Sequence, residues 1–143
     1  MIHEALKASE LPPFCPYVSI PVVLIVDDEP DIRLIGELSL REIAGWTVHL
    51  AESGLEAVSM VPKICPDILL LDVMMPELDG PSTLLKLREL EMLQNCCVIF
   101  LTAKAQTHEV QRYLDFGAAG VIPKPFDPIK LPELIREFMA EAA

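Results

Sequence analysis

From residue 22 onwards the chain alternates short apolar runs with longer stretches whose apolar residues recur at helical spacing. The short runs are rich in Val, Ile and Leu, which is typical of strands buried on both faces of a parallel sheet. They predict strands at 22–26, 46–50, 67–71, 97–101 and 120–122. The longer stretches predict helices at 31–44, 54–63, 81–93, 106–116 and 128–140. In the first of these helices we expect the apolar positions to face the protein, namely Ile32, Ile35, Leu38 and Leu40.

Strands that alternate with helices predict a parallel sheet covered by helices on both faces. Right-handed crossovers leave few strand orders, and the flavodoxin-like order 2-1-3-4-5 is favoured for a chain of this size. The predicted fold class is therefore α/β, a flavodoxin-like doubly wound five-stranded parallel sheet with five helices.

Residues 1–20 fall outside this alternation. A regular helix is excluded over residues 12–21, because this segment contains four prolines, Pro12, Pro13, Pro16 and Pro21. We therefore divide the chain into an N-terminal Pro-rich extension, residues 1–20, and one folded domain, residues 21–143. Because residues 12–21 carry apolar side chains that would otherwise be exposed, we expect them to pack on the domain. A linker, a docking arm or a disordered tail remains an alternative.

The composition supports one globular domain. The chain has 143 residues, of which 52% are hydrophobic, and this is enough for a real core. The net charge of −11 argues against a nucleic-acid-binding surface, because phosphate backbones require clustered Lys and Arg. The charge predicts a solvated acidic surface or, more locally, an acidic pocket for a cation.

The sequence also bears on the cellular compartment. No apolar run approaches the roughly 20 residues that a membrane span requires. Charges occupy the first ten residues, where a signal peptide would have its apolar centre. The four cysteines show neither a CxxC motif nor a Cys/His zinc spacing. We therefore expect a cytoplasmic protein with free thiols.

Polar side chains follow four of the predicted strands at their carboxyl ends. Asp27 and Asp28 follow the first strand, Asp72 the third, Thr102 the fourth, and Lys124 the fifth. The carboxyl ends of parallel strands meet at one edge of the sheet, where ligands bind. Each residue alone has a simpler explanation, such as a helix cap or a surface lysine. Together, the carboxylates would repel one another without a cation and a lysine, so we favour a functional site.

These residue types suit phosphoryl chemistry. The carboxylate of Asp72 can accept a phosphoryl group and form an aspartyl phosphate. Asp27 and Asp28 can hold Mg²⁺ through oxygen ligands. The metal and Lys124 would neutralise charge on the phosphoryl oxygens, and Thr102 can donate a hydrogen bond to one of them.

Four segments then identify a family resemblance, namely VVLIVDDEP (22–30), ILLLDVMMPELDG (68–80), VIFLTAK (98–104) and GAAGVIPKPF (117–126). In this order and spacing they resemble the receiver domain of two-component response regulators, over roughly residues 21–140. The resemblance implies that Asp72 is the phosphoacceptor, Thr102 the switch hydroxyl and Lys124 the site lysine. It also implies a Mg²⁺ site formed by Asp27, Asp28, Asp72 and the backbone carbonyl of Met74.

The resemblance implies three further features. Pro125 should follow a cis peptide bond. Met74 and Lys104 occupy positions that tune hydrolysis of the aspartyl phosphate in such domains, and we expect them to slow it. The family usually has an aromatic residue three positions before the lysine, which moves with the switch hydroxyl. This chain has Val121 there, so we expect no rotating ring at that position.

The implied function is a signalling switch rather than an enzyme. The phosphoryl group would come from a sensor histidine kinase or a histidine phosphotransfer protein, and the output would be contact with a downstream protein target. No direct nucleic-acid contact is expected. An aspartate-nucleophile phosphatase is the alternative, but it would need a proton-transferring side chain at Met74. A dinucleotide or flavin binder would need a Gly-rich turn where this chain has DDEP.

The output itself stays open at this point. We expect no output module after Ala143. The chain fits a stand-alone regulator, a phosphorelay intermediate or a receiver cut from a longer protein.

Overall fold

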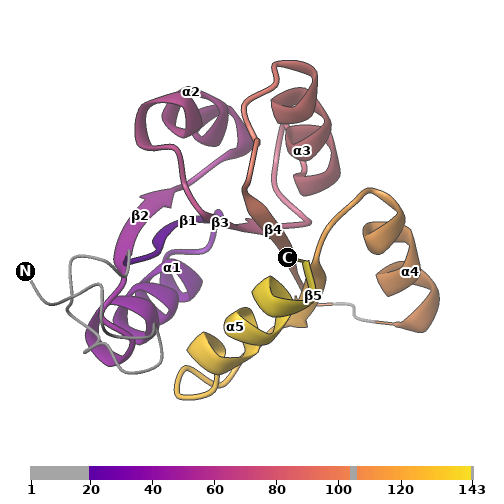
Figure 1. Ribbon diagram of the computed structural model, residues 1–143. Coiled ribbons are helices and arrows are strands. Elements are labelled where there is room, and N and C mark those ends of the chain that lie inside the picture. Colours follow the sequence, from indigo (N-terminus) through magenta and orange to yellow (C-terminus); the bar gives the residue numbers. More distant parts are fainter. Residues whose placement is uncertain (1–19, 104–105, 143) are drawn as a thin grey trace, which may run out of the picture.

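The computed structural model describes residues 20–103 and 106–142. Strands and helices alternate through these residues (Figure 1), with the bounds β1 Val22–Val26, α1 Pro30–Glu37, β2 Thr47–Ala51, α2 Gly54–Ile64, β3 Ile68–Asp72, α3 Gly80–Glu89, β4 Cys97–Thr102, α4 Thr107–Asp115, β5 Gly120–Pro123 and α5 Leu131–Ala142. Within the described residues the strands form one five-stranded sheet in the order β2-β1-β3-β4-β5. Every neighbouring pair in it is parallel. The predicted fold class and strand order are therefore confirmed.

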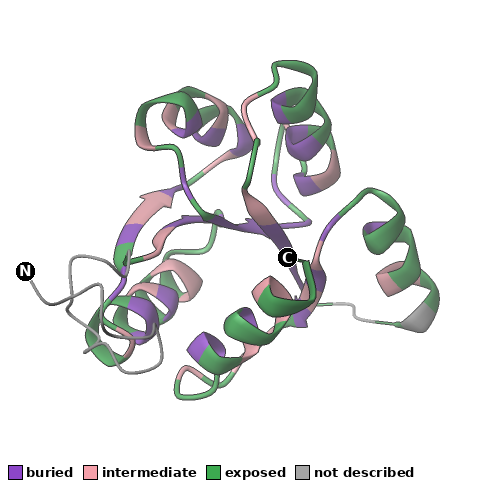
Figure 2. Cartoon of the chain, viewed as in Figure 1, coloured by how far each residue is buried: buried purple, intermediate pink, exposed green. Residues whose placement is uncertain are grey.

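Helices cover both faces of this sheet. Alternate strand residues such as Leu69 and Leu71 pack with α2, α3 and Tyr113 of α4. The intervening residues, such as Ile68 and Leu70, pack against the first helical segment and α5. Figure 2 shows the buried positions concentrated in the sheet and on the inner sides of the helices. β1, β3 and β4 are buried on both faces of the sheet, and this explains why their sequences are almost continuously apolar.

The first helix differs from the single helix that we predicted over 31–44. It is α-helical over Pro30–Glu37 and continues as a π-helical segment, Leu38–Ile43. A π-helical turn contains more residues, so the side chains that follow Glu37 leave the α-helical periodicity. Leu40 is fully buried as expected, but Leu38 is 50% exposed and Ile35 is 37% exposed. The prediction that both face the protein was wrong.

The boundaries of four strands differ by one residue from those predicted. β4 and β5 each end one position later, at Thr102 and Pro123. β2 and β3 begin at Thr47 and Ile68, one position later than predicted. Asp67 instead precedes β3, and its carboxylate accepts a hydrogen bond from the Val22 amide at 2.8 Å. As a result, Asp72 is the last residue of β3 and its backbone is held in the parallel ladder opposite Leu101.

Residues 1–19 lie outside the described residues, and so does most of the segment 12–21 that we expected to pack on the domain. The described part begins at Ile20, and the Pro21 carbonyl accepts a hydrogen bond from the Thr47 amide.

Candidate functional site

The carboxyl ends of four strands bring the predicted site residues together. β1 leads into Asp27 and Asp28, β3 ends in Asp72, β4 ends in Thr102 and β5 is followed by Lys124. Asp27, Asp72 and Thr102 are almost completely buried, with 0%, 2% and 2% of their surface exposed. Buried ionisable groups are rare unless they are paired, so the arrangement needs a partner for these charges.

Lys124 is that partner. Its ammonium lies 2.8 Å from Asp27 Oδ2, 3.0 Å from Asp72 Oδ1 and 3.1 Å from Glu29 Oε1. The backbone directs it there, because the Lys124 amide donates to the Thr102 carbonyl at 2.8 Å. The peptide bond between Lys124 and Pro125 is cis, and the prediction is confirmed.

The carboxylates form one compact cluster. One oxygen from each of Asp27, Asp28, Glu29 and Asp72 lies within 4.8 Å of the others. Glu29 was not predicted as a site residue, because an acid before Pro30 has the position of a helix cap. It occupies the N-cap position of α1 but makes no capping hydrogen bond through its side chain. Its carboxylate pairs with Lys124 instead.

Among the described residues, two buried carboxylate oxygens of the cluster have no hydrogen-bond partner, Asp27 Oδ2 and Asp72 Oδ2. Asp27 Oδ2 is ion-paired with Lys124 at 2.8 Å, so Asp72 Oδ2 is the one left without a contact to a cation. An unpaired buried carboxylate oxygen is costly, because it has lost its water without gaining a partner. Among the described residues, four carboxylates against one lysine also leave a surplus of negative charge. The donor set is all oxygen, which suits a hard divalent cation, so these residues could hold a metal ion.

The electrostatics of Asp72 follow from its position. Burial raises the pKa of its carboxyl from 3.8 to about 7. The hydrogen bond to Lys124 opposes this rise, and the negative charge of Asp27 adds to it. For Lys124 burial alone would lower the pKa, but hydrogen bonds to Asp27 and Asp72 raise it above its ordinary value. The lysine is therefore fully charged at neutral pH and favours ionised Asp72.

The loop after β3 is held close to Asp72 by a glycine. The Gly80 amide donates to the Val73 carbonyl at 2.9 Å. A Cβ on Gly80 would overlap the carbonyl oxygen of Asp72 and lie 2.9 Å from the Val73 Cα. Asp79, just before it, caps α3 by accepting from the Ser82 amide. The Asp-Gly pair of the LDG sequence thus starts α3 and lets it approach the strand that carries Asp72.

The remaining predicted positions have different outcomes. Met74 is 73% exposed, and its amide lies 3.4 Å from Asp72 Oδ1. Val121 lies opposite Phe100 in the sheet and packs against the core that includes Phe100 and Tyr113. Lys104 lies outside the described residues.

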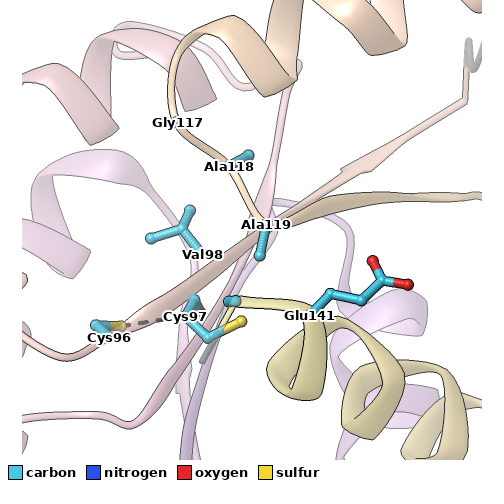
Figure 3. Close-up of a pocket in the computed structure, with 8 residues that line it drawn as sticks. Cys96, Cys97, Val98, Gly117, Ala118, Ala119 and Glu141 are labelled. Carbon is cyan, nitrogen blue, oxygen red and sulfur yellow. Dashed lines mark hydrogen bonds between the residues drawn. The ribbon is translucent and has the colours of Figure 1, made fainter.

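A concavity lies at the amino end of β4, opposite the end that carries Thr102. It has a volume of about 400 Å³ and is lined by Cys96, Cys97, Gly117 and Glu141 among others (Figure 3). Burial raises the pKa of the Cys96 thiol to about 12, so the thiol is protonated at neutral pH and is a poor nucleophile. Cys96 therefore supplies no activated nucleophile to this concavity.

The acidic cluster, the lysine paired with it and the strand order together define an α/β domain with a carboxylate site that could hold a cation. Comparison with known proteins places it more closely. The family model of the response regulator receiver domain matches residues 23–136, and the chain belongs to that family. Within the described residues, no helix is both long enough and apolar enough to cross a membrane.

Individual relatives agree with this assignment. The chain is 35% identical over 118 residues to response regulator Rre1 of Synechocystis sp., covering 82% of this chain and 51% of that protein. It is 32% identical to the DNA-binding dual master transcriptional regulator RpaA of the same organism, covering 83% of this chain and 49% of that protein. The chain thus spans about half the length of these curated relatives.

Solved structures show the same fold. The chemotaxis protein CheY4 of Vibrio cholerae is 28% identical, with a TM-score of 0.78, and the match covers 84% of this chain and 99% of that chain. The receiver domain of the Francisella response regulator 1452 is 29% identical, with a TM-score of 0.75 over 86% of this chain and 99% of that one. Relatives of this kind are signalling proteins, and a phosphatase is not favoured.

Proposed function

We propose that this receiver domain accepts a phosphoryl group on Asp72 from a phosphohistidine donor and acts as a phosphorylation-dependent switch. The observation that carries the proposal is the buried Asp72 carboxylate, which has one oxygen on Lys124 and the other unpaired. A nucleophilic carboxylate needs one free oxygen, held rigidly and close to positive charge. The end of β3 supplies both conditions.

The transfer itself balances simply. The unpaired carboxylate oxygen of Asp72 forms a bond to phosphorus while the bond between phosphorus and the imidazole nitrogen of the donor breaks. The imidazole leaves with the electron pair and is neutralised by a proton from water. Lys124 neutralises charge on the phosphoryl oxygens, and the Thr102 hydroxyl donates a hydrogen bond to one of them.

Mg²⁺ is the cofactor that suits this site, because it is a hard cation that prefers oxygen ligands and accepts phosphoryl oxygens beside carboxylates. When bound, it supplies charge neutralisation to the transferred group. Asp27, Asp28, Asp72 and the backbone carbonyl of Met74 would hold it. Asp28 is exposed and Asp27 is buried against Lys124, so we assign direct contact to Asp28 and a partly water-mediated role to Asp27.

The partners follow from the chemistry. A sensor histidine kinase or a histidine phosphotransfer protein supplies the phosphohistidine, and a downstream protein target reads the phosphorylated state in the cytoplasm. We propose that these residues do not themselves contact nucleic acid, because the net charge of −11 repels phosphate backbones. RpaA is described as DNA-binding, but this chain matches only 49% of that protein.

The test is labelling with acetyl phosphate, a small phosphodonor, in the presence of Mg²⁺. Acid-labile phosphate should appear on one residue in the wild-type chain and should be absent in Asp72→Asn. Glu137→Gln, which removes an exposed carboxylate of α5 away from the cluster, is the matched control and should label normally. Labelling that persists on another carboxylate in Asp72→Asn would refute the assignment.

A further inference from the structure

Tyr113 of α4 occupies the sheet surface beside the switch hydroxyl. Phe100 and Thr102 are two residues apart in β4 and therefore face the same side of the sheet. Val121 is the neighbour of Phe100 in β5 and belongs to the same apolar cluster. An aromatic residue at Val121 would have filled this surface. The short valine side chain leaves room for a group from another element.

The ring of Tyr113 fills that surface. Its centroid lies 5.2 Å from the Phe100 ring at an interplanar angle of 51°, a tilted arrangement that aromatic pairs favour. Only 5% of Tyr113 is exposed. The side chains of Tyr113 and Thr102 line the same concavity. Burial raises the pKa of the Tyr113 hydroxyl more than interaction with Thr102 lowers it, so the hydroxyl stays protonated at neutral pH.

This contact also holds α4 on the sheet. Among the α4 side chains that the structure describes, Tyr113 is the one that is buried, while Arg112, Leu114 and Asp115 are exposed. The helix faces a concavity of about 200 Å³ that is lined by Met74, Asp79, Thr102 and Arg112 together with Tyr113. The seating of α4 therefore depends on a side chain that lies beside Thr102.

We propose that Tyr113 is a positioning residue that couples the Thr102 hydroxyl to the seating of α4, in place of the aromatic residue that is absent at Val121. The inference deepens the proposed function and rests on it. When Thr102 turns its hydroxyl to a phosphoryl group on Asp72, its interaction with the Tyr113 side chain changes. The ring then changes its position against Phe100, and α4 loosens or shifts on the sheet.

The test compares three chains before and after acetyl phosphate with Mg²⁺. Tyr113→Phe keeps the ring and removes the hydroxyl. Tyr17→Phe makes the same change at the other tyrosine of the chain and is the matched control. Hydrogen exchange is followed at the amides of α4, since exchange reports local opening. In wild type and in Tyr17→Phe we expect phosphorylation to change the exchange rates of the α4 amides. In Tyr113→Phe this change should be at least threefold smaller, although Asp72 is still labelled.

A second measurement does not depend on any variant. The ring carbon signal of Tyr113 in a tyrosine-labelled wild-type chain, assigned by its loss in Tyr113→Phe, should move on phosphorylation. An unmoved signal, or an α4 exchange change that is equal in wild type and Tyr113→Phe, would overturn the inference and leave phosphotransfer to Asp72 intact. A wild-type chain that takes no label at Asp72 would overturn both proposals together.

Discussion

Lys124 and Asp72 form an ion pair of 3.0 Å that joins the ends of β5 and β3. The lysine also contacts Asp27 and Glu29, so one ammonium group offsets the charge of three carboxylates. Removing a partner from a buried charge pair is strongly unfavourable, because the remaining charge is left unpaired. The predictions below follow from this imbalance and from the geometry around it.

Lys124→Ala should lower the rate of phosphorylation by acetyl phosphate at least tenfold, which corresponds to about 1.4 kcal/mol of activation free energy. The variant removes the cation that favours ionised Asp72 and that would meet the phosphoryl oxygens. Lys130→Ala, at an exposed position before α5, is the control and should react normally. Equal initial labelling rates for the two variants would contradict the assigned role of Lys124.

The raised pKa of Asp72 predicts a pH-dependent stability. In the folded state this carboxyl has a pKa of about 7, against an ordinary value of 3.8. Folding therefore favours the protonated carboxyl. The resulting contribution to the free energy of unfolding is fully present below pH 3.8 and is lost as the pH rises through about 7. Asp72→Asn should therefore unfold at higher urea concentration than wild type at pH 8 without Mg²⁺, with a gain of about 1–3 kcal/mol.

At pH 5 the gain in stability of Asp72→Asn over wild type should be smaller, because most of the wild-type Asp72 carboxyl is then protonated. Adding Mg²⁺ at pH 8 should stabilise wild type and leave Asp72→Asn almost unchanged. A gain that is larger at pH 5 than at pH 8 would contradict the direction of the Asp72 shift.

Metal binding should depend on Asp28 more than on Glu29. Asp28→Asn should weaken Mg²⁺ binding at least tenfold, since it removes a charged oxygen ligand. Glu29→Gln should have a smaller effect, because its carboxylate is engaged with Lys124 at 3.1 Å. Calorimetry can follow the titration. An affinity in Asp28→Asn equal to that of wild type would remove Asp28 from the metal site.

Met74 should lengthen the life of the aspartyl phosphate. Its exposed thioether lines the concavity beside Thr102 and offers nothing to orient an attacking water. Met74→Asn should shorten the phosphorylated lifetime about tenfold, a plausible scale for positioning one water. Met74→Leu, which keeps the side chain apolar, should leave the lifetime within about twofold of wild type. Loss of labelled phosphate over time measures both.

Gly80→Ala should disturb the site through the backbone. The added Cβ would overlap the Asp72 carbonyl oxygen, so either α3 or the end of β3 must move. We expect a loss of stability of about 1–3 kcal/mol and a lower labelling rate. Gly45→Ala is an instructive comparison, because nothing lies within 4 Å of a Cβ there but its φ is +76°. That variant should lose stability through backbone strain and still label at the wild-type rate.

The order of the sheet and the meeting of Asp27, Asp72 and Lys124 could be predicted from the sequence, because parallel strands place their carboxyl ends at one edge. The role of Glu29 could not. Its place before Pro30 satisfies the pattern of a helix cap, and only the reach of Lys124 shows that the carboxylate serves the cluster. Tyr113 was missed for a different reason. Its contact with Phe100 depends on how α4 lies on the sheet, which hydrophobic spacing within one helix does not specify.

The site residues are divided between two halves of the chain. All four carboxylates of the cluster lie at or before Asp72, whereas Thr102 and Lys124 lie in or after β4. Between the halves runs an exposed turn in which Glu91 and Asn95 have positive φ angles, a loop of the kind that tolerates cleavage. A chain cut in this turn would carry the proposed nucleophile in one fragment and the side chains proposed to bind the phosphoryl group in the other. If mixing the two fragments restored phosphotransfer, the fragments would have reassembled through the pairing of β3 with β4.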